Sequence, residues 1–122
     1  MTQFYGELMF SLYDENQIKP CLDIINNIGE AIVKRRKDNT ISIRICTPIR
    51  NITDLDILTD ELYDMVFPYK EKIKIFLNNN TKVKCRIYFV KMSAGCDAAL
   101  GFTKKFIELA YDLDARIDFD GF

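Results

Sequence analysis

Four acidic side chains in the middle of the chain are spaced so that they would share one face of a helix. Asp56, Asp60 and Asp64 recur at every fourth position, and Glu61 lies beside them. Residues four apart are neighbours on a helix surface, where like charges slightly disfavour the isolated helix. Gathered carboxylates attract basic proteins and accept hydrogen bonds from arginine and lysine. The stripe is therefore either a contact surface for a basic partner or the solvated side of an amphipathic helix.

Two further carboxylates, Asp118 and Asp120, lie in the last segment, ARIDFDGF. Charged and apolar residues alternate there, which is typical of a strand with one buried face. The alternation predicts that Ile117 and Phe119 reach the core while the aspartates face solvent. Both groups of carboxylates supply the candidate partner-binding residues, which are Asp56, Asp60, Glu61, Asp64, Asp118 and Asp120.

Most catalytic constellations are missing, because the chain has no histidine. Without imidazole there is no Ser-His-Asp or Cys-His pair that activates a nucleophile, and no histidine-bearing metal site. The four cysteines show no C-x-x-C spacing. Cys96, in the loop sequence SAGCD, has only Asp97 beside it, a neighbour that disfavours the thiolate. We expect no catalytic residue, no metal site and no cofactor.

The net charge is −1, but the two signs are segregated along the chain. Residues 31–50 and 71–92 each sum to +5, whereas residues 1–30, 51–70 and 93–122 sum to −4, −4 and −3. Strands of opposite sign could pair across a solvent-facing sheet surface. Alternatively, a basic and aromatic surface made of KRRKDN, Lys82, Lys84, Arg86 and Tyr88 could bind single-stranded nucleic acid. We do not expect that binding, because the glycine-spaced aromatic motif of RNA-recognition sheets is missing.

Length and composition predict a single domain spanning residues 1–122. Hydrophobic residues make up 48% of the chain and charged residues 29%, which is the balance of a folded protein. The opening residues, MTQFYGELMF, lack the basic-then-apolar order of a signal peptide. No apolar stretch approaches the roughly 18 residues that cross a bilayer. We expect a cytoplasmic monomer or homodimer without membrane association.

The periodicity of apolar residues predicts the elements that position these side chains. Alternation predicts strands over 4–13, 30–37, 40–47, 82–91 and the final segment. Helical spacing predicts helices over 17–28, from Thr53 to 67, over 69–79, and after Thr103. Both threonines are expected to be N-caps. In the last helix, Phe106, Ile107, Ala110 and Tyr111 are expected to face the core.

This order of elements predicts an α+β fold, with a largely antiparallel five-stranded sheet and helices on one face. The first six elements match the βαββαβ pattern of ferredoxin-like domains, and a C-terminal helix and strand follow. Helices on one side leave the second sheet face exposed. In the strand over 82–91, alternation points Val83, Cys85, Ile87 and Phe89 inward and Lys82, Lys84, Arg86 and Tyr88 outward.

Three stretches of the chain resemble a small bacterial family, the domain-of-unknown-function 4279 family. They are FYGELMFSLYD, LDILTDELYDMVFPYKEKIKIFLNNNTKVKCRIYF and TKKFIELAYDLDARIDFDGF. Residues 20–40 depart from it, since many relatives carry a tryptophan near the first hairpin and this chain has none. The resemblance implies a bacterial protein without enzymatic activity, of the kind that includes immunity proteins of toxin systems. Asp118 and Asp120 match a recurrent polar motif of the family.

These observations predict a non-enzymatic binding protein, an immunity-type protein that neutralises a bacterial toxin by protein–protein contact. Two alternatives stay open. One is a domain that binds a small ligand or uses a carboxylate for catalysis. The other is a self-associating structural module, because the final strand is expected to be a sheet edge and edges pair. The sequence does not decide whether the acidic helix or the open sheet face meets the partner.

Overall fold

The computed structural model describes residues 2–92 and 101–122. Its strands are β1 (Thr2–Leu12), β2 (Ile32–Arg35), β3 (Ile41–Cys46), β4 (Arg50–Ile52), β5 (Lys84–Lys91) and β6 (Arg116–Asp120). Its helices are α1 (Ile18–Ile25), α2 (Asp56–Val66), α3 (Lys70–Asn79) and α4 (Lys104–Asp112). Short 3-10 turns, Glu15–Gln17 and Phe67–Tyr69, lead into α1 and α3. The predicted cysteine loop with Cys96 lies outside the described residues.

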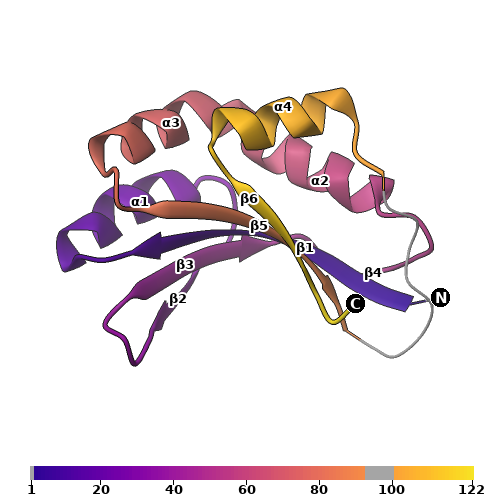
Figure 1. Cartoon of the computed structure of the whole chain (residues 1–122), viewed down its shortest axis with the longest axis horizontal. Coiled ribbons are helices and arrows are strands. Elements are labelled where there is room, and N and C mark those ends of the chain that lie inside the picture. Colours follow the sequence, from indigo (N-terminus) through magenta and orange to yellow (C-terminus); the bar gives the residue numbers. More distant parts are fainter. Residues whose placement is uncertain (1, 93–100) are drawn as a thin grey trace.

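The helices cover one face of the sheet, and the opposite face looks away from them (Figure 1). The strand order is β2-β3-β1-β5-β6, and β4 pairs with the start of β1. The pairs are antiparallel except for β5 with β6, which run parallel. These findings confirm the predicted α+β class and the mostly antiparallel sheet. The ferredoxin-like description of the first six elements stays a prediction.

The predicted count of five strands is wrong, because the residues that follow β3 form a sixth. β4 pairs Arg50, Asn51 and Ile52 with Phe4, Gln3 and Thr2 of β1. Only Ile52 in this strand is buried. A segment with a single buried side chain shows no alternation, so sequence periodicity could not reveal it.

The core lies between the sheet and the helices, and β1 runs through its centre. Leu8, Phe10 and Leu12 point to the helix side and are almost fully buried. The strand predicted over 82–91 is confirmed as β5, with Lys84 exposed and the alternate residues buried, namely Val83, Cys85, Ile87 and Phe89. Side chains on one sheet face therefore form the core, as period-two alternation requires.

Two helix starts test the predicted N-caps. The Thr103 hydroxyl accepts the N–H of Phe106, which confirms the cap of α4. The predicted cap at Thr53 is wrong, because α2 begins later, at Asp56. There the Asp54 carboxylate accepts the N–H of Asp56 at 2.9 Å. Among the described residues, no helix has the length and apolar character that crossing a membrane requires.

The predicted core face of α4 is partly wrong. Phe106 and Ala110 are buried, but Ile107 is 52% exposed and Tyr111 is 84% exposed. Leu109 and Leu113 take their places in the core. The buried set therefore follows the i, i+3, i+4, i+7 spacing of an amphipathic helix.

Phenylalanine rings join β6 to the rest of the core. The Phe89 ring lies 5.7–5.9 Å, between centroids, from those of Phe102, Phe106 and Phe119. The predicted inward direction of Phe119 therefore holds, although 40% of its surface stays exposed. Beyond β6, Gly121 has φ +83°, and a Cβ there would collide with the Lys91 carbonyl oxygen. Only glycine fits this turn.

Candidate functional site

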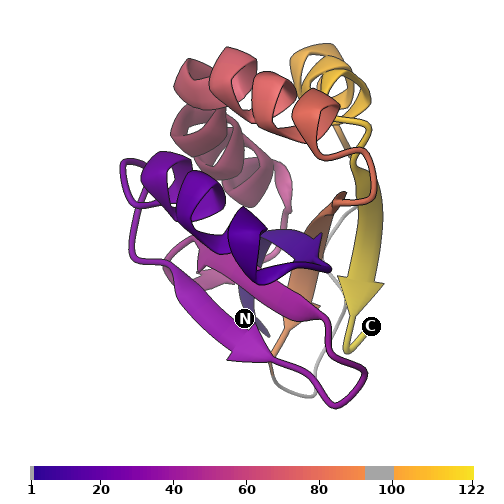
Figure 2. The ribbon, with the colours of Figure 1, turned by 90° about the vertical axis from the view of Figure 1, so that its left-hand side faces the viewer.

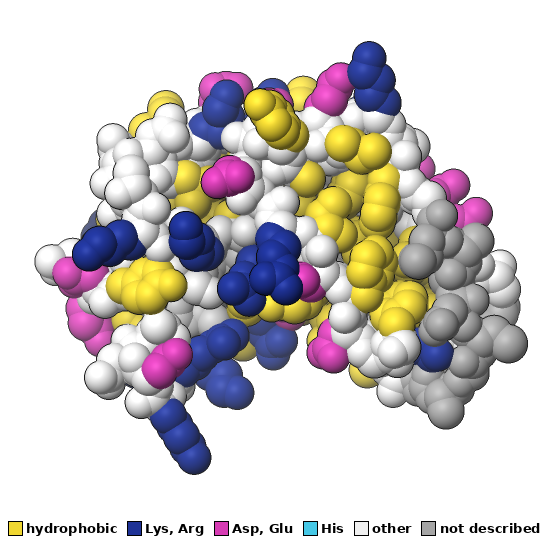
Figure 3. All heavy atoms as spheres, in the orientation of Figure 1, with side chains coloured by type: hydrophobic (Ala, Val, Ile, Leu, Met, Phe, Trp, Pro, Cys, Tyr) yellow, Lys and Arg dark blue, Asp and Glu magenta, His cyan; other side chains and the backbone are white. Residues whose placement is uncertain are grey.

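A hollow of about 250 Å³ lies in the open face of the sheet. We call it the open-face hollow. Its walls come from the strands and from the hairpin between β2 and β3. In Figure 3, basic side chains gather in the lower middle of the view, below the helices, with acidic side chains to their right. The lining residues are Tyr5, Glu7, Met9, Lys34, Arg36, Ser42, Arg44, Tyr88, Val90 and Asp120.

Strand pairing explains how residues far apart in sequence meet in this hollow. Glu7 of β1 pairs with Cys46 of β3 on one side and with Tyr88 of β5 on the other. Alternate residues of a strand share a face, so Tyr5 and Met9 lie on the same side as Glu7. β1 therefore forms the floor of the hollow, while its neighbours supply the surrounding charges.

The carboxylate of Glu7 is buried although it belongs to the open face. Glu7 is only 5% exposed, and its Oε1 accepts a hydrogen bond from Arg44 Nη1 at 2.8 Å. Burial alone lowers the pKa of Arg44, but the hydrogen bond and charge of Glu7 outweigh it, so the pKa is raised. This pair confirms that charges of opposite sign meet across neighbouring strands. The Arg44 guanidinium is held in one place and stays cationic.

Neighbouring groups of the hollow are also held, and each keeps the protonation state that it has at neutral pH. Burial, followed by the charge of Glu7, raises the pKa of Cys46 to about 11 and raises that of Tyr5. Arg86 donates to the Tyr88 hydroxyl at 3.3 Å, and this hydrogen bond raises the arginine pKa. None of these shifts brings a group toward titration near neutral pH. The arrangement presents fixed charges rather than a proton donor or acceptor.

The hairpin adds two further cations to the rim of the hollow. Lys34 and Arg36 line it from the β2 side, and Arg36 Nη2 lies 3.5 Å from Met9 Sδ. Asp120 lines it from the β6 side. The hollow is therefore basic toward β2 and β3 and acidic toward β6.

The acidic stripe of α2 is only partly free. Arg50 of β4 donates to both carboxylate oxygens of Glu61, at 2.8 and 3.2 Å. Lys105 of α4 lies 3.9 Å from the Asp60 carboxylate. Asp56 and Asp64 are exposed. The predicted helix surface is thus shared with two cations and is less acidic than the sequence suggests.

The two aspartates of β6 lie apart from that helix, on the open face. Arg116 Nε donates to Asp118 at 2.8 Å, while the second carboxylate oxygen of Asp118 is buried without a hydrogen-bond partner among the described residues. Asp120 is exposed. The six predicted residues therefore do not form one surface, and only Asp120 lines the open-face hollow. Sequence reasoning missed Glu7 and Arg44; the basic block over 31–50 was the available signal.

The remaining cysteines of the described chain lie in the core. Burial raises the pKa of the Cys21 thiol to about 12 and also raises that of Cys85. Both therefore serve as small apolar side chains. In the part of the chain that the structure describes, no three metal-ligating side chains come together.

A second depression, of about 520 Å³, lies between α1 and α3 and is lined largely by apolar side chains, among them Ile24, Ile75 and Phe76. Its one charged lining residue is Lys72. Its other polar lining residues are Asn79 and Asn80, and it has no pair of opposite charges like Glu7 and Arg44. The open-face hollow is therefore the stronger candidate site.

Comparison with known proteins assigns no relatives: no protein-family model matches the chain, and neither a curated protein nor a solved structure shows significant similarity to it.

Proposed function

We propose that this protein is a non-enzymatic binding protein whose open-face hollow contacts a protein partner. The observation that carries the proposal is the Arg44 guanidinium, fixed by the buried Glu7 carboxylate at 2.8 Å. A charge that is already held loses little further side-chain entropy when a partner binds it. The hydrogen bond from Arg44 offsets part of the cost of burying the Glu7 carboxylate, and it leaves a positioned cation in the wall of the hollow.

One alternative from the sequence, a small-ligand-binding or carboxylate-based enzyme domain, has weaker support. A carboxylate-based enzyme would use Glu7, but that carboxylate is already engaged by Arg44. A general base needs a carboxylate oxygen that is free to reach the proton that it removes. The hollow, at about 250 Å³, is also smaller than the roughly 300–1,000 Å³ of small-molecule sites. The depression between α1 and α3 reaches that size, but it has a single charged lining residue, Lys72. A partner side chain that enters from a larger protein surface fits these dimensions better.

The charges of the hollow indicate the character of the partner. An acidic protrusion would meet Lys34, Arg36 and Arg44, while a basic group beside it would meet Asp120. Complementary charge of this kind guides encounter and selects partners. A bacterial toxin neutralised by an immunity-type protein is the specific form that we propose, on the basis of the family resemblance.

Co-expression tests this proposal. Toxin candidates encoded beside the gene would be expressed with the wild-type protein, and we expect restored growth and a co-purifying complex. Arg36→Glu should abolish both, because it places a carboxylate where the acidic protrusion binds. Lys104→Glu is the matched control, since Lys104 is exposed and lies on α4, outside the hollow. No rescue by the wild-type protein, or equal rescue by both variants, would contradict the proposal.

A further inference from the structure

We propose that a second copy of this chain extends the sheet edge to edge, with β6 of one copy beside β2 of the other. This inference does not rest on the proposed function. It concerns the two outer strands of the sheet, whose charges are of opposite sign.

Both outer strands have an open side. Among the described residues, β2 pairs only with β3 and β6 pairs only with β5. Figure 2 shows β2 along the lower left edge of the sheet and β6 along the right. All four residues of β2 are exposed, including the apolar Ile32 and Val33. An exposed strand edge offers unpaired backbone groups to another strand.

The hairpin fixes which backbone groups of β2 point outward. The Arg36 N–H bonds to the Thr40 carbonyl oxygen at 2.8 Å, and Lys34 is paired with Ser42. Hydrogen-bonded and non-hydrogen-bonded pairs alternate along an antiparallel ladder. Val33 and Arg35 therefore direct their N–H and C=O groups away from β3, toward the open edge.

The strand directions allow one simple arrangement. β2 is antiparallel to β3, which is antiparallel to β1, and β6 runs with β5, which is also antiparallel to β1. β2 and β6 therefore run in opposite directions within one sheet. A shifted copy with its helices on the same side consequently presents β6 antiparallel to β2.

One register of this pairing sets unlike charges against each other. When Lys34 faces Asp120 of the second copy, the antiparallel pattern brings Arg36 opposite Asp118. The same register brings Asp38 of the turn level with Arg116. On the helix side, the exposed part of Phe119 lies level with the side-chain stem of Arg35. Cross-strand pairs of opposite charge and apolar contacts of this kind stabilise neighbouring strands.

Pairing of like edges is disfavoured by the same charges. Two β2 strands would place the Lys34 and Arg36 side chains of both copies together, and two fully overlapped β6 strands would set Asp118 against Asp118. Like charges directly opposite one another destabilise a strand pair. Each edge therefore disfavours pairing with a second copy of itself, whereas the β2 edge and the β6 edge are complementary in charge.

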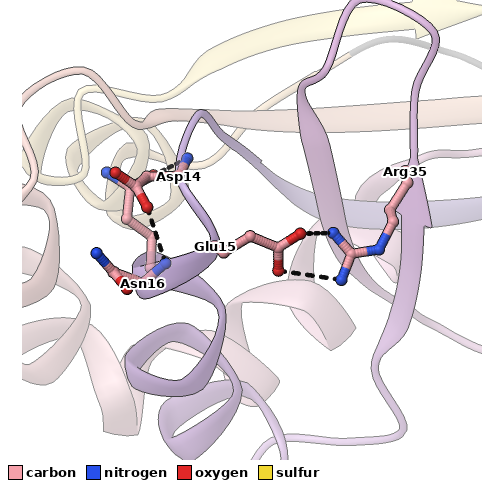
Figure 4. A network of polar contacts seen from close by, with 5 residues as sticks. Asp14, Glu15, Asn16 and Arg35 are labelled. Atoms are coloured by element: carbon pink, nitrogen blue, oxygen red, sulfur yellow. Dashed lines mark hydrogen bonds and ion pairs between the residues drawn. The ribbon is translucent and has the colours of Figure 1, made fainter.

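The β2 edge is held in position from the helix side. Glu15, in the 3-10 turn before α1, binds the Arg35 guanidinium through both carboxylate oxygens (Figure 4). The Asp14 carboxylate caps the same turn by accepting the N–H of Asn16. Because β2 is short, the shared surface falls below that of stable dimers. We expect weak, concentration-dependent assembly that salt weakens further.

Charge-swap complementation tests the inference. Light scattering of the purified wild-type protein should show a mass that rises with concentration and falls toward the monomer at high salt. Lys34→Glu and Asp120→Lys each place like charges at the interface, and each alone should weaken association by about tenfold. An equimolar mixture should recover the wild-type behaviour, because the carboxylate introduced in one variant then meets the ammonium group introduced in the other.

A backbone variant separates strand pairing from general charge attraction. Val33→Pro removes an outward N–H that β3 does not use, so the fold should survive while assembly is lost. Circular dichroism would verify the fold of each variant, and Lys104→Glu serves as the surface control. A wild-type protein that stays monomeric at millimolar concentration would overturn the inference. So would a mixture that fails to assemble, or undiminished assembly of Lys34→Glu, which would indicate that β6 pairs with itself.

Discussion

The two faces of the sheet are built from the same strands but bury different kinds of side chain. On the helix side, β1 contributes Leu8, Phe10 and Leu12 to a core without charged side chains. On the open side, the same strand contributes Tyr5, Glu7 and Met9 to a hollow in which a carboxylate is buried beside a guanidinium. Burial of apolar area stabilises the fold, whereas burial of an ion pair contributes little net stability.

The buried residues of the two faces differ in what they contribute. A buried pair is weak evidence for stability, because desolvation of both charges offsets their attraction. Glu7 and Arg44 are therefore better explained by the position in which they hold a cation than by the energy they add. The comparison predicts that substitutions on the helix side mainly change stability, while those on the open side mainly change binding.

The largest effect is expected for Phe89→Ala. Phe89 is fully buried and contacts three other phenylalanine rings, so its truncation should lower the free energy of unfolding by about 3–5 kcal/mol. Urea denaturation followed by circular dichroism would measure this loss. A loss below about 1 kcal/mol would show that the aromatic cluster is not part of the stabilising core.

A smaller effect is expected on the open side for Glu7→Gln. This change removes the charge while keeping the shape, and should cost roughly 1–3 kcal/mol, because Arg44 then loses its charged partner. The double variant Glu7→Gln with Arg44→Gln should cost less than the sum of the two single changes. Additive losses in this cycle would show that the two side chains do not interact.

The buried thiols predict a loss of stability at alkaline pH. Burial raises the pKa of Cys46 to about 11 and that of Cys21 to about 12, from 9.0 in the unfolded chain. The unfolded state therefore releases these protons first. The stabilisation is complete below pH 9 and disappears as pH rises through the folded pKa values. The loss is up to about 1.4 kcal/mol per pH unit for the buried Cys21 and smaller for Cys46, which is only half-buried.

Urea titrations from pH 8 to 12 would measure this alkaline slope. Cys21→Ala, on the helix side, should reduce it up to about pH 12, whereas Cys46→Ala should reduce it only up to about pH 11. An unchanged slope in both variants would assign the alkaline loss to other groups.

The smallest effect is expected for Tyr111→Ala. Its side chain is 84% exposed, so the change should alter the free energy of unfolding by less than about 0.5 kcal/mol. Leu109→Ala, two residues earlier and buried, should cost about 2–5 kcal/mol. Similar losses of unfolding free energy in the two variants would support the core face that the sequence predicted for α4.

Sequence patterns located most elements because each carries an apolar period of its own. The alternation of β5 set both faces of that strand correctly. In α4, two apolar stripes share Phe106 and Ala110, and periodicity alone cannot choose between them. Tertiary packing selects the stripe with Leu109 and Leu113, while the amphipathic Tyr111 tolerates water.

The candidate site was harder to predict, because its charges come from strands that are distant in sequence. Glu7 alternates with apolar residues, a pattern that by itself is typical of a side chain in contact with solvent. It is buried between neighbouring strands, where Arg44 of β3 binds its carboxylate and Tyr88 of β5 lies opposite it in the ladder. Strand order and register decide which side chains of different strands meet, and neither can be read from a single sequence. The basic block over 31–50 indicated where the cations of the hollow lie, but it did not identify Glu7 as the partner of Arg44.

The central position of β1 also bears on how the chain folds. β1 is made before both of its long neighbours, and its pairing with β5 must wait until Lys84–Lys91 have been synthesised. Contacts between distant segments slow folding relative to helical proteins of similar size. Until β5 arrives, Phe4, Leu8 and Phe10 lack the neighbouring strand of the finished sheet, and apolar surface left exposed in this way promotes aggregation.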